Sequence, residues 1–532
     1  MHKISILAHG FIKRELPIDS VFYTITFIVI IRTLFELLLG RLQSFKMNPD
    51  FYGNLVGYMH FYLSWICIFF TVAVIVTPFL RLRLIEGIRL TLLCFPIIIS
   101  VPFVDFVATG GVGGVIQYSG DIGNFFFYYV NCLNPFAPVE IITPGVRLEI
   151  FLVVAGSFLG SRFIFRMGFL RSIFFSLALY TMIFFYGYLP PLYTCVGLDF
   201  KSVSLSVTGM LRSQKFLSIY IAPSIIVISA LVYLSARERR GTLTTVVSCL
   251  YPSRLSFYLF LLIFGFLVTA HQHNLYPQIL NTDDLVKLLL SIISIGLLFV
   301  WSKIINDLYD IDIDRISNRE RPLAGGGISE EGARAIANVI IIVSLAFAIS
   351  SERSFIFYWL FIWSMSSVYS RFPLRLRRFY PVGHMILSLI GVSAFLSGSA
   401  LVISYKAYEA MQGKEILLHI LLTFFFLSHI KDFKDREGDK VGRVYNILNY
   451  LKFPKILGVV SLVGFLCSLC AILYTLSLLN GLAVAGILLF LAGGLYFIIT
   501  IKDTKKVDRL LPACFILLIY VSGVSLYLIT VR

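Results

Sequence analysis

Residues 306–314 read NDLYDIDID, and residues 431–439 read KDFKDREGD. Both segments contain three aspartates in the spacing D-x₂-D-x₃-D, and both follow a long apolar run. On a helix with 100° per residue, the three aspartates of each segment fall within about 60° of one another. Asp312 and Glu437 fall on the opposite face. The repeated spacing therefore predicts two helix ends that each direct three carboxylates to one side.

Crowded carboxylates repel one another and are costly beside hydrocarbon. A divalent cation removes that repulsion, and Mg²⁺ commonly binds through one or two carboxylates together with substrate phosphates. Two facing clusters have the ligands for two Mg²⁺ ions with a diphosphate between them. The pattern thus predicts chemistry on a diphosphate, with the metals neutralising the leaving group.

Composition places the chain in a membrane. Of its 532 residues, 58% are apolar and only 14% charged, with a mean hydropathy of +0.88. About a quarter of a soluble protein is charged. The net charge of +16 comes from short basic tracts between apolar runs, such as residues 237–240 and 375–378. That distribution argues against nucleic acid as a partner and favours cytoplasmic loops that contact membrane lipids.

The apolar runs predict an all-α integral membrane protein with about fifteen transmembrane helices. Six form an N-terminal domain at residues 1–236, a basic linker follows at 237–254, and nine form a bundle at 255–532. The expected spans lie near 21–40, 58–80, 87–107, 148–166, 169–188, 216–236, 255–271, 285–305, 333–350, 353–370, 381–403, 415–431, 455–478, 481–501 and 509–530.

Loop charge predicts the orientation of these spans. The basic loops all lie an even number of spans from the basic N-terminus, whereas the alternate loops are neutral or acidic. The positive-inside rule then places the N-terminus in the cytoplasm and the C-terminus outside. Because four spans separate the two aspartate motifs, both lie at the cytoplasmic face.

The motifs resemble those of a known family. Asn306-Asp307-x-x-Asp310-x-x-x-Asp314 matches the N-D-x-x-D-x-x-x-D motif of the UbiA superfamily of intramembrane prenyltransferases, and residues 435–439 match its second motif, D-x-x-x-D. Residues 321–323 and 369–378 resemble the family's segments after the first motif and between the fourth and fifth helices. The family has nine transmembrane helices. The resemblance covers residues 240–532, and we recognise no family in residues 1–236.

The resemblance implies transfer of a prenyl group from a polyprenyl diphosphate to a lipophilic acceptor: a quinone precursor, an aromatic compound or a lipid. One Mg²⁺ is expected at Asn306, Asp307, Asp310 and Asp314, and the other at Asp432, Asp435 and Asp439. Asp307, Asp310, Asp435 and Asp439 are expected to be essential for catalysis. The expected substrate-binding residues are Asn306, Arg321, Lys431, Arg375, Arg371, Lys303 and Tyr369.

Other interpretations of these residues stay open. Arg371 and Arg375 also fit simple positive-inside topology, Lys303 also fits a side chain extended toward the headgroups, and Tyr369 also fits packing. A terpene cyclase would use the same motifs. A cation-coupled transporter favours acids at the bilayer midplane and inverted repeats, whereas these acids end spans on one side and their repeat is parallel.

Overall fold

The computed structural model describes residues 13, 17–36, 38–39, 51–111, 123–134, 142–194, 221–238, 252–273, 282–371, 373–403, 415–441, 444–445, 447–477 and 479–530. The chain divides into two compact units, Met1–Leu243 and Thr244–Arg532. Within the described residues every regular element is a helix, which confirms the predicted all-α class. The division between the units falls inside the basic segment that the sequence suggests as a linker.

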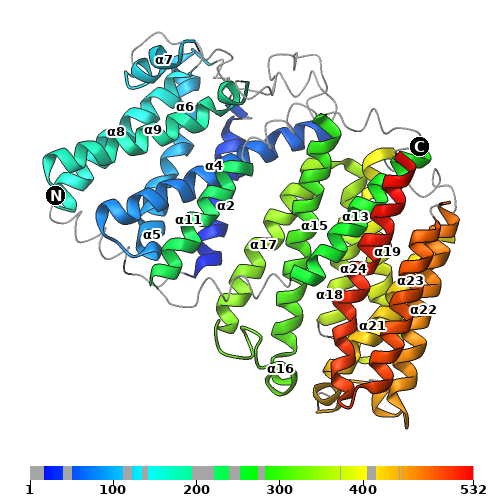
Figure 1. Ribbon diagram of the computed structural model, residues 1–532. Helices are drawn as coiled ribbons and strands as arrows, with labels where there is room; N and C mark the ends of the chain where they lie inside the picture. Colours follow the sequence, from blue (N-terminus) through cyan, green and yellow to red (C-terminus); the bar gives the residue numbers. More distant parts are fainter. Residues whose placement is uncertain are drawn as a thin grey trace. The chain divides into compact units, whose positions relative to one another are not determined.

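The N-terminal unit contains eight described α-helices (Figure 1). They are α2 (Ile18–Glu36), α4 (Phe51–Leu80), α5 (Leu84–Cys94), α6 (Ser100–Ala108), α7 (Phe125–Asn131), α8 (Pro144–Leu159), α9 (Phe169–Thr194) and α11 (Ile221–Glu238). The span predicted at 87–107 is interrupted, because a 3₁₀ turn at Phe95–Ile99 separates α5 from α6. Pro96 at the start of this turn has no N–H to donate to the preceding helix.

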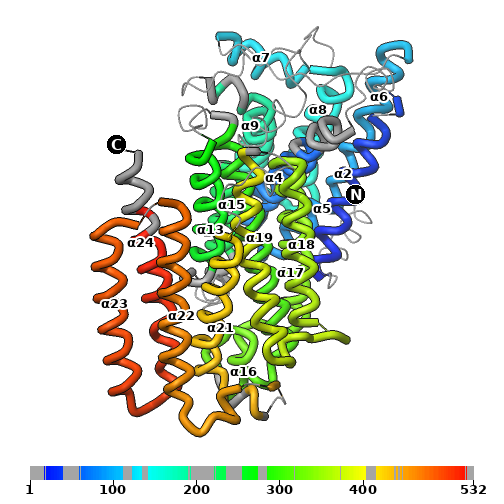
Figure 2. The backbone as a smooth tube through the Cα atoms, turned by 90° about the vertical axis from the view of Figure 1, so that its right-hand side faces the viewer, coloured from blue at the N-terminus to red at the C-terminus, as the bar shows by residue number. Residues whose placement is uncertain are grey.

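The C-terminal unit contains ten described α-helices. They are α13 (Pro252–Gln272), α15 (Thr282–Tyr309), α16 (Ile311–Ser317), α17 (Glu330–Ser351), α18 (Arg353–Ser370), α19 (Val382–Ile403), α21 (Glu415–Val441), α22 (Pro454–Thr475), α23 (Gly481–Thr500) and α24 (Leu510–Thr530). Figures 1 and 2 show the long helices of this unit side by side as a bundle, with the short α16 at the same end as the last turns of α21.

A helix overlaps each of the fifteen segments that the sequence predicts as spans. Ten helical stretches of the described residues are long and apolar enough to cross a membrane. The chain is therefore an integral, multi-pass membrane protein. The total of fifteen spans stays a prediction.

Small side chains bring the helices of the C-terminal bundle close together. Ser294 on α15 and Ser344 on α17 each donate a hydrogen bond to the other's carbonyl oxygen at 2.8 Å. Gly398 on α19 packs directly against the carbonyl oxygen of Leu262 on α13. Small residues of this kind allow helix backbones to approach one another in a membrane, where packing and hydrogen bonds drive association.

We expect Gly398→Ala to destabilise the C-terminal unit, because the new methyl group would collide with the Leu262 carbonyl. Overpacking of this kind costs about 1–3 kcal/mol, and thermal unfolding in detergent should show a lower midpoint. Gly493→Ala is the matched control, because no atom lies within 4 Å of a methyl group at that position of α23. Equal midpoints for the two variants would contradict the tight α13–α19 crossing.

Candidate active site

The first aspartate motif lies where α15 ends and α16 begins. α15 ends at Tyr309, and Asp310 interrupts the helix with a φ of −111°. The sequence predicts one regular helix here, whereas the structure shows two helices separated at Asp310. The facing of the side chains is nevertheless as predicted, because Asp307, Asp310 and Asp314 are buried whereas the Asp312 side chain is 88% exposed.

The second motif lies on α21, which continues without a break to Val441. Lys431, Asp435 and Asp439 line a cavity inside the bundle. Asp432 is not among the described residues that line it, and its carboxylate lies 3.0 Å from His384 Nε2 on α19. At 100° per residue Asp432 stands about 60° to one side of Asp435. The structure therefore separates Asp432 from the other expected Mg²⁺ ligands, and its role as a ligand stays a prediction.

Basic side chains lie against the carboxylates of the first motif. Lys303 Nζ is 2.5 Å from Asp307 Oδ1, and Arg321 Nη1 is 3.0 Å from the same oxygen. Arg321 also pairs with Asp314. All four side chains are buried. A charge taken out of water needs a partner of opposite sign, and here each carboxylate has one.

Arg375 and Arg371 occupy different positions from those expected of diphosphate ligands. Arg375 Nη2 donates hydrogen bonds of 2.8 Å to Asp310 Oδ1 and to the Tyr309 carbonyl. The Arg371 guanidinium lies over the ring of Trp301, 5.1 Å from its centroid. Neither arginine is among the described residues that line the cavity. Direct contact with a diphosphate stays a prediction for both.

Two residues that the sequence did not single out connect the motifs. Arg377 pairs with Asp310 of the first motif, and its Nη2 lies 3.6 Å from Asp439 Oδ1 of the second. Asn318 donates hydrogen bonds to a carboxylate of each motif. The basic tract 375–378 was a signal for Arg377, although sequence cannot say which arginine of a tract turns inward. No sequence signal distinguished Asn318.

Burial changes the charge properties of this polar region. It raises the pKa of the Asp314 carboxyl above its usual range, an effect that Arg321 and Lys303 oppose. Burial also lowers the pKa of the Arg375 guanidinium. Both shifts arise because an environment that excludes water disfavours the charged form. Cations close to the Asp314 carboxyl therefore favour its ionised state.

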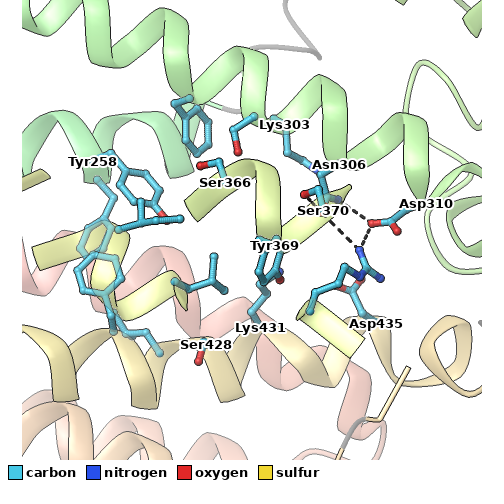
Figure 3. Close-up of a pocket in the computed structure, with 18 of the residues that line it drawn as sticks. Tyr258, Lys303, Asn306, Asp310, Ser366, Tyr369, Ser370, Ser428, Lys431 and Asp435 are labelled. Atoms are coloured by element: carbon cyan, nitrogen blue, oxygen red, sulfur yellow. Dashed lines mark hydrogen bonds and ion pairs between the residues drawn. The ribbon is translucent and has the colours of Figure 1, made fainter. Parts of the chain in front are cut away.

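The cavity has a volume of about 160 Å³, and nine of the residues expected at the site from sequence line it. Figure 3 shows several of them converging from α15, α18 and α21. The nine are Lys303, Asn306, Asp310, Asp314, Arg321, Tyr369, Lys431, Asp435 and Asp439. The structure thus brings both motifs to one polar region, although they are more than a hundred residues apart.

The cavity has an aromatic end as well. Figure 3 shows Tyr258 across the cavity from Asp310. Beside it, Phe257 stacks on Phe515 with ring centroids 4.0 Å apart and lies 4.7 Å from the ring of Phe424. Buried aromatic rings provide a large apolar contact area. The cavity is therefore polar and charged at one end and apolar at the other.

The oxygen atoms at the polar end suit Mg²⁺. No group of three or more acidic, histidine or cysteine side chains in the described residues forms a complete metal site. However, Asp310, Asp314, Asp435 and Asp439 line the same cavity, together with the amide of Asn306. Carboxylate and amide oxygens are the ligands that Mg²⁺ prefers, usually together with substrate phosphates. The donor set fits Mg²⁺ shared with a phosphate group.

Comparison with known proteins points to one family. A digeranylgeranylglyceryl phosphate synthase of Methanocaldococcus jannaschii is 27% identical over 161 residues, which are 30% of this chain and 53% of that protein. The enzyme of the same name from Sulfolobus acidocaldarius is 30% identical over 154 residues, 28% of this chain and 52% of the relative. The chain thus spans about half the length of the curated relatives it matches.

Solved structures that match part of this chain include a UbiA homolog from Archaeoglobus fulgidus bound to GPP and Mg²⁺. It is 17% identical, with a TM-score of 0.36, and the match covers 53% of this chain and 99% of that one. The family match itself is at the level of sequence. Residues 258–519, which include both aspartate motifs and almost all of the cavity, match the UbiA prenyltransferase family. The C-terminal unit of this chain belongs to the UbiA prenyltransferase family.

Proposed function

We propose that this protein transfers a prenyl group from a polyprenyl diphosphate to an acceptor within the membrane, with the help of Mg²⁺. The observation that carries the proposal is a single cavity with two chemically different ends. Acidic and basic side chains from both aspartate motifs form one end, and stacked aromatic rings form the other. A prenyl diphosphate has the same division, with a charged head and an apolar tail. Family membership of residues 258–519 supports the same activity.

The polar end would hold the diphosphate and two Mg²⁺ ions. Asn306, Asp310, Asp314, Asp435 and Asp439 are the oxygen donors we assign to the metals. Bound Mg²⁺ would neutralise the negative charge that collects on the diphosphate as its bond to the prenyl carbon breaks. These side chains come from two parts of the chain, α15 with α16 and α21, so they can reach a ligand from both sides.

Basic side chains would bind the diphosphate oxygens directly. Lys303, Arg321, Arg377 and Lys431 line the cavity beside the carboxylates. Hydrogen bonds from ionised donors to phosphate are about twice as strong as neutral ones. These residues would orient the head group so that the prenyl carbon points toward the apolar end. Tyr369 also lines the cavity, and its ring would contact the prenyl group.

The acceptor we favour is a lipid that carries a glyceryl phosphate. Support comes from the relatives, which are named digeranylgeranylglyceryl phosphate synthases. An acceptor of this kind has a hydroxyl group as its nucleophile and an anionic head, which suits a site with several cations. A terpene cyclase would release a cyclic hydrocarbon without consuming an acceptor, so analysis of the products separates the two activities.

We further propose that the site faces the cytoplasm and that the N-terminus lies on the same side. The support is the alternation of basic and neutral loops along the chain. In this orientation the site is open to soluble Mg²⁺, while the apolar end of the cavity lies at the depth of the lipid chains.

Asp310→Ala and Asp435→Ala should each reduce prenyl transfer by at least a hundredfold, because each removes a carboxylate that lines the polar end. Transfer is measured with radiolabelled prenyl diphosphates and a panel of acceptors in detergent. Asp312→Ala is the matched control, since its side chain is 88% exposed and faces away from the cavity. Normal Mg²⁺-dependent turnover in both cavity variants would rule out the assigned site.

Arg377→Ala should raise the KM for the prenyl diphosphate roughly tenfold, because a hydrogen bond to a charged group contributes about 1.5–3 kcal/mol. The measurement is initial rate against donor concentration at saturating Mg²⁺. Arg315→Ala provides the comparison: Arg315 is 57% exposed, and its partner is the exposed Asp312. An unchanged KM in Arg377→Ala would remove this residue from the proposed diphosphate site.

A chain of residues 237–532 should retain Mg²⁺-dependent transfer, because every described residue that lines the cavity lies in the C-terminal unit. The specific activity of this shorter chain is compared with that of the full chain, and Asp310→Ala in the shorter chain gives the background rate. Loss of activity from a folded shorter chain would assign the N-terminal unit a direct part in the reaction.

A further inference from the structure

Asn318 lies between the two aspartate motifs. It follows the last residue of α16 and is only 1% exposed. Its side-chain Nδ2 donates to Asp314 Oδ1 at 3.0 Å and to Asp435 Oδ1 at 3.2 Å. One amide group thus joins a carboxylate of the first motif to a carboxylate of the second, across 117 residues of sequence.

The orientation of this amide follows from the chemistry of its partners. An ionised carboxylate only accepts hydrogen bonds, so the NH₂ group must face both aspartates. That leaves Asn318 Oδ1 buried and without a hydrogen-bond partner. A buried polar atom in this state is unfavourable. The backbone of Asn318 is bonded independently, its N–H to the Asp314 carbonyl and its carbonyl to the Arg321 N–H, so the side chain is not needed to end α16.

Asn318 also differs in charge from the other residue that joins the motifs. Arg377 contacts Asp310 and Asp439 with a full positive charge. Asn318 is neutral, so it holds Asp314 and Asp435 near each other without cancelling their negative charge. The cation that already lies beside Asp314 is Arg321. A neutral hydrogen-bond donor suits two acids that bind a cation. It fixes the orientation of both carboxylates and does not compete with the ion for their charge.

We propose that Asn318 is a positioning residue that sets the spacing of Asp314 and Asp435 and thereby the affinity of the site for Mg²⁺. This inference rests on the proposed function. Asn318 lies outside both aspartate motifs, and it acts on the metal through the carboxylates. Supporting residues of this kind typically change metal affinity by about 10–100-fold when they are replaced.

The test is a titration of the purified full-length protein with Mn²⁺, followed by electron paramagnetic resonance in the absence of substrate. We expect Asn318→Ala to bind the ion at least tenfold more weakly than the unaltered protein. The Mg²⁺ concentration for half-maximal transfer should rise by a similar factor, with little change in kcat at saturating Mg²⁺. Asn318→Gln, which keeps the amide on a longer side chain, should recover part of the affinity.

Asn480→Ala is the matched control. Asn480 caps α23, where its Oδ1 accepts a hydrogen bond from the Ala483 N–H at 2.9 Å. Its replacement should lower the thermal midpoint without changing the Mn²⁺ titration. Equal Mn²⁺ affinity in Asn318→Ala and Asn480→Ala would overturn the positioning role. If Asn318→Ala does not fold, Asn318→Leu decides, because it keeps the size of the side chain and removes the amide: Mn²⁺ affinity equal to that of the unaltered protein overturns the role as well.

The outcomes separate this inference from the proposed function. If the unaltered protein transfers prenyl groups with Mg²⁺ and Asn318→Ala shows the same Mg²⁺ dependence, the inference fails and the function stands. If the unaltered protein binds Mn²⁺ but transfers no prenyl group to any acceptor, the proposed function fails. The titration still reports in that case whether Asn318 sets the spacing of the carboxylates.

Discussion

Compensation of buried negative charge is the constraint on which the C-terminal unit depends. Asp307, Asp310 and Asp314 lie at the end of a membrane-spanning helix and are almost completely buried. Burying a carboxylate is strongly unfavourable unless a cation or hydrogen-bond donor accompanies it. Lys303, Arg321, Arg375 and Arg377 provide the cations, and they come from different parts of the chain. The same compensation that allows the acids to be buried also draws the helices around them into one arrangement.

That arrangement produces a cavity with a charged end and an apolar end. The charged end is formed by helix termini and the loops that follow them, where polar groups are tolerated in a membrane protein. The aromatic end lies among the spanning helices, where the rings of Phe257, Phe424 and Phe515 pack together. The combination suits a substrate with an anionic head and an isoprenoid tail, and it accounts for an aspartate-rich site in a chain that is otherwise strongly apolar.

Helical periodicity predicted which way most of the aspartates face, but not which side chains they contact. The exposure of Asp312 followed from its angle on the helix, and the break at Asp310 did not alter it. The position of Asp432 did not follow: periodicity places it on the same side as Asp435 and Asp439, but it is not among the described residues that line the cavity. Its carboxylate lies next to His384, a residue 48 positions earlier in the chain. The position of Arg371 could not be predicted from the sequence either. Its guanidinium lies over Trp301, and this contact depends on how α18 packs against α15.

By itself the sequence determined the all-α membrane class, the family of the C-terminal unit and the four acids that line its cavity, Asp310, Asp314, Asp435 and Asp439. Each of these depends on local spacing or on composition, which can be read along the chain. Only the tertiary structure decided which cation contacts which carboxylate, and that Arg377 and Asn318 join the two motifs. The contacts of Arg377 with Asp310 and Asp439, and that of Asn318 with Asp435, connect residues about 60 to more than a hundred positions apart. They depend on how the helices pack and on the need to pair every buried charge, and neither is encoded in the spacing of any one segment.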